Sequence, residues 1–178
     1  MSNHRLVMSE SQLNTAILDL AKAIISAHPV LDHLVFIGIL TRGYPLAQRL
    51  AHYIFELSGH QLLVGKLDVS LYRDDLLDRS IFVTVNQTDI VFDIRNKTVI
   101  LVDDVIFSGR TIRAALAGIA DFGSPDAIEV AVLIDRGFRK LPVFANYVAH
   151  SIDVNDAYHV QVKLFEIDGS DEIMLIAD

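Results

Sequence analysis

Two adjacent carboxylates follow a run of aliphatic residues in the middle of this 178-residue chain. The stretch V-I-L-V-D-D-V-I-F-S-G-R-T covers residues 99–111 and places Asp103 and Asp104 after four apolar residues. Side by side at the end of a buried strand, two carboxylates repel each other unless something relieves their charge. A ligand with adjacent hydroxyl groups would give each carboxylate a donor, and a magnesium ion nearby would reduce the repulsion further.

The residues after the acid pair have the composition of a phosphate-binding loop. Ser108, Gly109 and Thr111 are small, and they precede a helical pattern. Glycine lets the backbone approach a ligand closely, and the first N–H groups of a helix are unpaired and favour an anion. The loop is not a Walker A loop, because G-x-x-x-x-G-K-[ST] is absent. A sugar with cis hydroxyls and a 5′-phosphate would match both halves of the stretch.

Each half of the stretch also has an ordinary structural interpretation. Paired acids at a strand end are more often a turn or helix cap, and a Ser-Gly loop before a helix is usually a cap. Receiver domains of response regulators also carry paired acids after an apolar strand. There the pair lies near the N-terminus, and no Ser-Gly-Arg-Thr loop follows it. The thirteen residues together are therefore far more specific than either half.

The elements that must position these residues alternate between helices and apolar strands. Ser9 and Gln12 have capping-box spacing, and the apolar residues that follow recur on one helical face. Gly59 and Gly123 each follow a helical pattern, as expected at helix C-termini. We predict helices over residues 9–27, from the 40–43 loop to about 57, and about 111–122, and strands over 33–39, 62–69, 98–102 and 127–134.

This alternation predicts an α/β fold with a mostly parallel central sheet covered by helices on both faces. In such sheets ligands bind outside the carboxyl ends of the strands. Three predicted strand ends carry unusual chemistry: Thr41-Arg42-Gly43, Asp103-Asp104 and Asp135-Arg136-Gly137. We expect these three ends to converge on one site.

Two further segments complete the chain. Residues 71–97 begin with the densely charged LYRDDLLDR and continue with SIFVTV and DIVFDI, which Asn86-Gln87-Thr88 separates. This pattern predicts a hairpin or a projecting arm. The tail, 147–178, is expected to form short strands and loops.

Composition limits the classes of function. The length fits a single domain, and 52% apolar residues supply ample core material. We find no run of about 18 apolar residues and no secretory signal, so neither a membrane span nor export is expected. The lack of cysteine excludes disulfides and thiol catalysis and fits a cytoplasmic protein. The net charge of −8 argues against broad nonspecific binding to nucleic acid.

Four motifs together carry a resemblance to a known family. They are GILTRG (38–43), LYRDD (71–75), VILVDDVIFSGRT (99–111) and VLIDRGFRKLP (132–142). The third resembles the phosphoribosyl-pyrophosphate (PRPP) motif of type I phosphoribosyltransferases. The set resembles one branch, the PyrR family, whose members are pyrimidine-operon attenuators with uracil phosphoribosyltransferase activity. The resemblance implies the type I phosphoribosyltransferase fold, with 71–97 as a flexible hood.

The resemblance also implies roles for individual residues. Asp103 and Asp104 would hold the ribose hydroxyls of magnesium-bound PRPP, and through it the Mg²⁺ ion. Thr41 and Arg42 would bind the pyrophosphate, which Arg73 could also reach from the hood. Around the 5′-phosphate the motif would place Val105, Ile106, Phe107, Ser108, Gly109, Arg110 and Thr111.

The base would lie beside Arg136, with the backbone near Val160 completing the uracil pocket. The implied reaction is pentosyl transfer that gives UMP and pyrophosphate. Leaving-group stabilisation by Arg42 and positioning of the sugar by Asp103 and Asp104 would dominate catalysis, and Asp104 would act as a general base or only as a ribose ligand.

The implied partners include the leader mRNA of pyrimidine genes, bound when UMP is present, and further copies of the chain in a homodimer or higher oligomer. Departures from the family pattern concern the RNA surface. The first helix offers only Asp19 and Lys22, and Phe138 stands where a histidine is common, although Arg139 and Lys140 remain. Two alternatives therefore stay open: an enzyme without RNA regulation, and a type I phosphoribosyltransferase for a purine, which should differ around residues 135–138.

Overall fold

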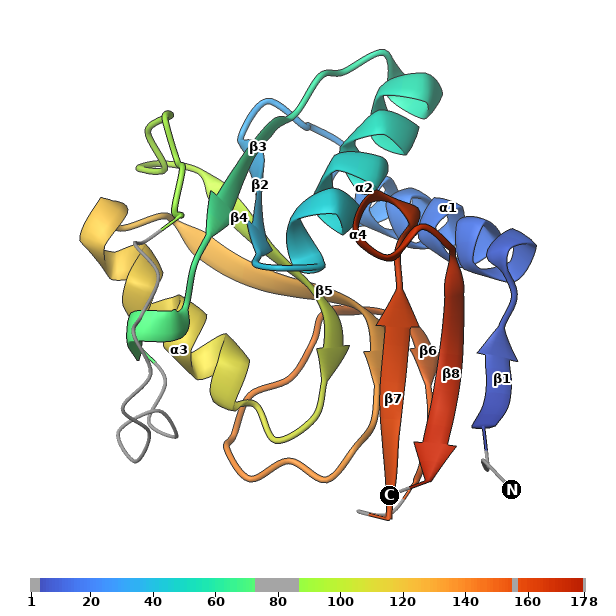
Figure 1. Cartoon of the computed structure of the whole chain (residues 1–178). Coiled ribbons are helices and arrows are strands. Elements are labelled where there is room, and N and C mark those ends of the chain that lie inside the picture. Colours follow the sequence, from blue (N-terminus) through green and yellow to red (C-terminus); the bar gives the residue numbers. More distant parts are fainter. Residues whose placement is uncertain (1–3, 73–86, 155–156, 178) are drawn as a thin grey trace.

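The charged residues at the predicted strand ends belong to a five-stranded parallel sheet (Figure 1). The computed structural model describes residues 4–72, 87–154 and 157–177. All four strand pairings in this sheet are parallel, as predicted. In spatial order the strands are β3 (Leu63–Leu67), β2 (Leu34–Ile39), β4 (Thr98–Ile106), β5 (Ala127–Asp135) and β6 (Tyr147–Ser151).

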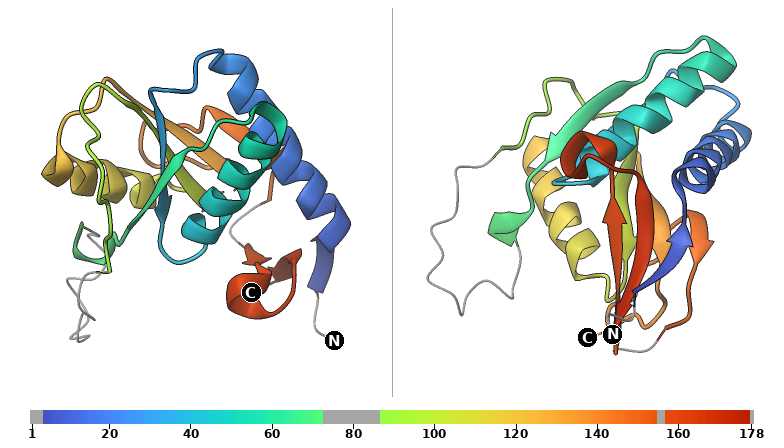
Figure 2. Two further views of the ribbon diagram at one scale, coloured as in Figure 1. Left: turned by 90° about the horizontal axis from the view of Figure 1, so that it is seen from above. Right: turned by 45° about the vertical axis from the view of Figure 1, so that its right-hand side comes forward.

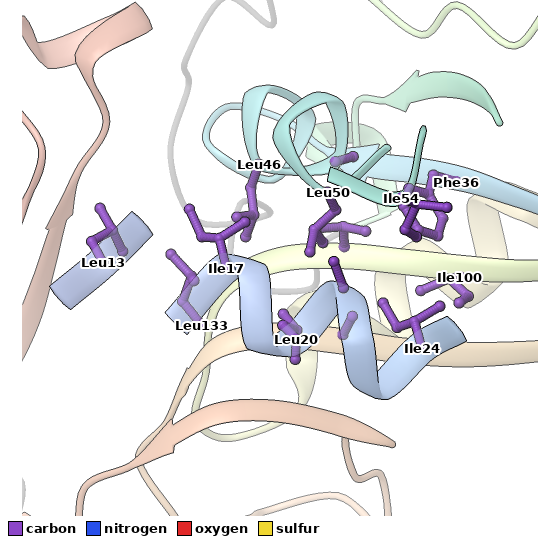
Figure 3. Packing of buried hydrophobic residues seen from close by; sticks show 14 of the residues in the cluster. Leu13, Ile17, Leu20, Ile24, Phe36, Leu46, Leu50, Ile54, Ile100 and Leu133 are labelled. Carbon is purple, nitrogen blue, oxygen red and sulfur yellow. The ribbon is translucent and has the colours of Figure 1, made fainter. Parts of the chain in front are cut away.

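Helices cover both faces of this sheet, which confirms the expected layers (Figures 1 and 2). On one face lie α1 (Glu10–Ala27) and α2 (Gly43–Ser58), and on the other lies α3 (Arg110–Ile119), extended by a 3₁₀ turn (Ala120–Phe122). Successive residues of β4 alternate between the two cores, because side chains of a strand point to opposite faces. Figure 3 shows the first core, to which α1 contributes Ile17, α2 contributes Leu50 and β4 contributes Ile100.

The helix boundaries follow from local chemistry. Ser9 and Gln12 form the predicted capping box at the start of α1, with the Ser9 N–H donating to Gln12 Oε1 at 2.9 Å. At the end of α2, Gly59 adopts φ 72°, a left-handed conformation that glycine accepts without a Cβ penalty. In the described ranges no helix has the length and apolar character needed to cross a bilayer.

Strand β4 is longer than predicted. Its ladder with β5 continues past Val102, so that Asp103 lies opposite Val132 and Ile106 opposite Asp135. The predicted end of this strand at Val102 is therefore wrong: Asp103 and Asp104 belong to the strand. The physical reason is that Val105 and Ile106, β-branched residues with strong strand preference, continue the pairing beyond the acids.

A second, antiparallel sheet is built from both ends of the described chain. Its order is β1 (His4–Met8), β8 (Glu172–Ala177) and β7 (Tyr158–Lys163), and the short helix α4 (Phe165–Asp168) connects β7 to β8. These elements confirm the prediction of short strands and loops in the tail. Figure 1 shows α4 beside the beginning of α2, and ion pairs described below join the two.

The predicted arm is only partly described. The 3₁₀ turn Ser70–Tyr72 begins it, and residues 73–86, with the expected strand over 80–85, lie outside the described residues. The expected strand over 89–94 is not formed: only Asp89 pairs, with Lys66 next to the sheet edge. Beyond Asp89 the burial of Ile94, with Ile90 and Phe92 against the α3 core, ties the segment down through side chains instead of a ladder.

Candidate functional site

The three predicted strand ends meet at the carboxyl edge of the central sheet. β2 and β5 lie on either side of β4, and the Arg136 N–H donates to the Ile106 oxygen at 3.0 Å. Gly43 begins α2 against the end of β4: a Cβ built there would lie 2.2 Å from the Val102 oxygen. The predicted convergence of Thr41-Arg42-Gly43, Asp103-Asp104 and Asp135-Arg136-Gly137 is therefore found in the structure.

The loop before α2 is held tightly as well. Gly38 in β2 leaves room for the returning helix, because a Cβ there would lie 2.3 Å from the Tyr44 Cα. The Leu40–Thr41 peptide bond is cis, and the Leu40 N–H donates to the Leu67 oxygen of β3 at 3.0 Å. Thr41 is exposed in the turn, and Arg42 occupies the N-cap position of α2.

The acid pair is largely withdrawn from water. Asp103 is only 7% exposed, and Asp104 is partly buried. Each carboxylate accepts the backbone N–H of the next residue: Asp104 N–H to Asp103 Oδ1, and Val105 N–H to Asp104 Oδ1, both at 2.9 Å. Burial raises the pKa of Asp104, while its hydrogen bond with Asp103 and the charge of Arg42 act in the opposite direction. The pair is thus a buried acid site that a donor or a cation would stabilise.

The residues after the acids line a recess of about 260 Å³, formed by Val105 to Ile112. Gly109 adopts φ 89° at the N-cap of α3, so the helix starts directly from the loop. Only glycine fits there, because a Cβ would lie 2.2 Å from Val143 Cγ2. The N–H groups at the start of α3, with Ser108 and Thr111 beside them, give this recess the chemistry of an anion site.

A second loop, residues 137–143, is hydrogen-bonded to the loop that forms this recess. The Ser108 oxygen accepts the N–H groups of Lys140 and Leu141 at 3.0 and 3.2 Å. Arg139 donates from Nη1 to the Phe107 oxygen at 2.8 Å and from Nη2 to Asp135 Oδ2 at 2.6 Å. Its other contacts are to the Gly137 oxygen at 3.0 Å and, from Nε, to the Val143 oxygen at 3.1 Å. The Arg139 guanidinium therefore ties the two loops together.

Arg136 bridges the recess and the antiparallel sheet. It is 9% exposed, its guanidinium lies 4.2 Å from the centre of the Phe107 ring, and Nη2 donates to the Tyr158 oxygen of β7. In the described part of the chain, Nε of Arg136 is buried without a hydrogen-bond partner. Buried N–H groups without a partner are rare in folded proteins, so this group is a candidate donor to a ligand or an ordered water.

The remaining predicted residues are placed less directly. Val160 lies in β7, two residues from the Arg136 contact at Tyr158, and its side chain packs against the core. Val160 can thus face a base only through its backbone, and its role stays a prediction. Arg73 lies outside the described residues.

The structure adds residues that the sequence interpretation did not include. Asp168 of α4 forms a two-point ion pair with Arg42, and Arg49 of α2 pairs with Glu166 and Asp171 at 2.6 and 2.8 Å. The acidic spacing E-x-D-G-x-D at 166–171 was a visible signal, although nothing in it shows which arginine it meets. The sequence suggests Arg139 only as a surface cation for RNA, yet its guanidinium donates to four protein acceptors.

Arg139→Lys tests whether the Arg139 guanidinium fixes the shape of the recess loop. A single ammonium group cannot replace a guanidinium that spans four acceptors, so the loop at Ser108–Gly109 should lose its fixed shape. We expect the KM for a phosphorylated substrate to rise about tenfold, the equivalent of one or two lost hydrogen bonds. The control is Lys140→Ala, which removes an exposed neighbouring charge but keeps the backbone bond to Ser108. Equal effects of the two variants in steady-state kinetics would show that charge alone is responsible.

Comparison with known proteins agrees with this geometry. The protein-family model of the phosphoribosyl transferase domain matches residues 9–166 of this chain. The fold is also that of solved structures. A hypoxanthine-guanine phosphoribosyltransferase from Leishmania tarentolae, in complex with GMP, has a TM-score of 0.74 at 18% identity, covering 100% of this chain and 98% of the other. One from Bacillus anthracis has a TM-score of 0.73 at 21% identity, covering 98% of each.

Curated relatives are much closer in sequence. The bifunctional protein PyrR of Chloroflexus aurantiacus is 44% identical over 99% of this chain and 97% of its own. That of Desulfosudis oleivorans is 46% identical over 95% and 94%, and that of Thermus thermophilus 41% identical over 95% and 93%. The chain therefore belongs to the phosphoribosyltransferases and, within them, to the PyrR family of uracil phosphoribosyltransferases and pyrimidine-operon regulators.

Proposed function

We propose that this chain transfers the phosphoribosyl group of PRPP to uracil, giving UMP and pyrophosphate. One observation carries the proposal: the buried pair Asp103 and Asp104 leads directly into an anion recess at residues 105–112, with Arg42 close enough to act electrostatically on Asp104. In a ribose 5-phosphate with a charged leaving group on C1, the hydroxyls would meet the acid pair, the phosphate would enter the recess and the leaving group would meet Arg42.

Each part of PRPP has a matching part of the site. Asp103 and Asp104 would accept hydrogen bonds from the ribose 2′- and 3′-hydroxyls, which would offset the cost of their burial. The N–H groups at the start of α3 would bind the 5′-phosphate. Arg42 would bind the leaving pyrophosphate through its planar fork, together with backbone groups at Thr41.

The residues present also fit a magnesium ion carried by PRPP. Carboxylate oxygens are the ligands that Mg²⁺ prefers, and burial of Asp104 with a raised pKa marks a place where added positive charge is favourable. Asp103 and Asp104 would hold the ion indirectly, through PRPP. When bound, Mg²⁺ would neutralise part of the pyrophosphate charge.

The chemistry then depends mainly on positioning. The bond between ribose C1 and pyrophosphate breaks, the sugar becomes oxocarbenium-like, and uracil N1 forms the new bond to C1 and loses its proton. Arg42 would stabilise the departing charge, while Asp103 and Asp104 hold the sugar. Asp104 is the carboxylate we assign as general base or as ribose ligand alone.

The base and the hood complete the proposal. Uracil would lie beside Arg136, whose buried Nε is a free donor in the described part of the chain, and next to the backbone near Val160. The segment 71–97, held near its end by the buried Ile94, would act as a hood that excludes water from PRPP, with Arg73 reaching the pyrophosphate. We further propose a cytoplasmic location, in keeping with the cysteine-free sequence, and association at least to a homodimer.

A panel of bases tests the activity. With PRPP and Mg²⁺, we expect pyrophosphate release with uracil and not with hypoxanthine, guanine or orotate. Asp104→Asn should lower kcat/KM for PRPP at least about a hundredfold, because it removes a charged ligand of the sugar. Release with a purine and not with uracil would instead identify the alternative type I phosphoribosyltransferase.

The stability of Asp104→Asn tests whether the buried Asp104 carboxylate destabilises the fold when no ligand is bound. Because burial raises the pKa of Asp104, the folded chain binds this proton more tightly than the unfolded chain. Ionisation thus costs stability as pH rises above about 4, and the cost is absent below that range. Without ligand, Asp104→Asn should raise the melting temperature by about 2–4 °C at pH 7.5, with the gain vanishing near pH 4.

The matched control is Asp126→Asn. Asp126 is an exposed carboxylate just before β5, at the amino ends of the strands. Scanning calorimetry over pH 4–8 should show no comparable gain for it. A lower melting temperature for Asp104→Asn at pH 7.5 would contradict the claim that burial of the ionised Asp104 carboxylate costs stability.

We propose RNA-dependent regulation of pyrimidine genes as a second function, on the basis of family membership. Two of the cations that the sequence suggests for RNA, Lys22 and Arg139, are engaged within the protein. Lys22 of α1 pairs with Asp19 at 3.0 Å, and the Arg139 guanidinium is engaged by the protein. A groove of about 590 Å³ between α1 and β6 has no lysine or arginine among its lining residues. RNA affinity should therefore be modest, with a shallow dependence on salt.

A gel shift with leader RNA of pyrimidine genes measures this function. We expect a shift that requires UMP and that weakens only slightly between about 50 and 200 mM salt, since few phosphates are neutralised. No UMP-dependent shift at low salt would leave the chain as an enzyme without RNA regulation.

A further inference from the structure

The pair between Arg42 and Asp168 uses only one side of the guanidinium. Nε donates to Asp168 Oδ2 at 3.1 Å and Nη2 to Oδ1 at 2.7 Å, so the carboxylate lies along the Nε–Nη2 edge. A guanidinium has five N–H groups in a fixed fork, and this geometry occupies two of them. The Nη1 end, in the described part of the chain, has no protein acceptor. It is the end that a phosphate can approach with two parallel hydrogen bonds.

Asp168 is itself held in place from two directions. Its Oδ2 also accepts the Leu164 N–H at 2.9 Å, which closes the α4 turn. The same turn is anchored to α2 by Arg49, which donates to Glu166 at 2.6 and 2.8 Å and to Asp171 at 2.8 Å. Asp171 in turn accepts the Phe165 N–H at 2.7 Å. The carboxylate that meets Arg42 thus sits on a turn whose position is fixed by side chains 117 to 126 residues away in sequence.

From this geometry we infer that Asp168 is a positioning residue of the active site: it holds the Nε–Nη2 edge of Arg42 so that the Nη1 end faces the pyrophosphate of PRPP. The inference rests on the proposed function of Arg42. It assigns the antiparallel sheet a part in catalysis, because β7 and β8 carry the turn that directs a ligand-binding side chain of the parallel sheet.

A purely structural ion pair would behave differently. Arg42 and Asp168 side chains are 31% and 18% exposed, and ion pairs with that much solvent contact contribute little to stability. Loss of Asp168 should therefore leave folding almost intact. Its consequence should appear in ligand affinity, because a freed arginine adopts many side-chain conformations and must lose that freedom on binding.

Asp168→Asn is the test variant, since it keeps an acceptor for the Leu164 N–H but removes the charge and one acceptor for the Arg42 fork. The probe is inorganic pyrophosphate with Mg²⁺, titrated into the full chain by calorimetry, alongside steady-state kinetics with PRPP and uracil. We expect the Kd for pyrophosphate and the KM for PRPP to rise about tenfold, with the KM for uracil and the melting temperature unchanged. Asp168→Glu should recover part of the loss.

Two comparisons make the result specific. Glu172→Gln removes a charge close to the same turn, but Glu172 contacts Lys163 instead of Arg42 or Arg49, so this variant should leave pyrophosphate binding unchanged. In an Arg42→Ala background, Asp168→Asn should have no further effect on pyrophosphate binding, because its action passes through Arg42.

The outcomes separate this inference from the proposed function beneath it. If Arg42→Ala leaves pyrophosphate binding intact, the assignment of Arg42 fails, and the role of Asp168 falls with it. If Arg42→Ala weakens binding but Asp168→Asn does not, Arg42 keeps its role and the inference about Asp168 alone is overturned. Tighter binding in Asp168→Asn would also overturn it, because Asp168 would then compete with pyrophosphate.

Discussion

Two carboxylates are buried near the carboxyl end of the central strand β4, and this burial is the constraint on which the rest of the site depends. Asp103 and Asp104 continue strand β4, so they cannot turn away into solvent as loop residues would. Backbone N–H groups and the charge of Arg42 offset only part of their burial, and the pKa of Asp104 remains raised. Such a pair is kept in a fold when a ligand supplies the missing donors.

The surrounding elements are arranged around this pair by close backbone contacts. Gly43 lets α2 begin against the end of β4, and Gly38 lets the loop before it return over β2. Gly109 does the same for α3, and Arg139 fixes the loop that leads to it. Arg42, the acid pair and Arg136 thereby lie at the carboxyl ends of the same parallel sheet, although Arg136 follows Arg42 by 94 positions along the chain.

Much of this arrangement could be predicted from the sequence, because local patterns carry it. The apolar strands, the capping box at Ser9 and the helix-ending Gly59 are local signals, and strand ends of a parallel sheet must share an edge. The extent of β4 was underestimated, since the pairing of Asp103 to Ile106 depends on the neighbouring β5. Likewise the segment over 89–94 has the alternation of a strand, but burial of Ile94 replaces the expected ladder.

Partners of side chains far apart in sequence were beyond reach. Nothing in residues 166–171 identifies Arg42 and Arg49 as the arginines that these acids meet, because that depends on how the antiparallel sheet lies against α2. Arg139 resembles a surface cation until the positions of the Phe107 and Val143 oxygens are known. The base site is similar, since uracil would be bound largely by backbone groups and by the buried Nε of Arg136.

A crystal structure with Mg²⁺ and PRPP bound, without uracil, would show where the sugar lies. We expect the ribose 2′- and 3′-hydroxyls within hydrogen-bond distance of Asp103 and Asp104, and the 5′-phosphate on the N–H groups at the start of α3. A ribose bound elsewhere, with both carboxylates still contacting only protein, would contradict the claim that this acid pair exists to receive the sugar.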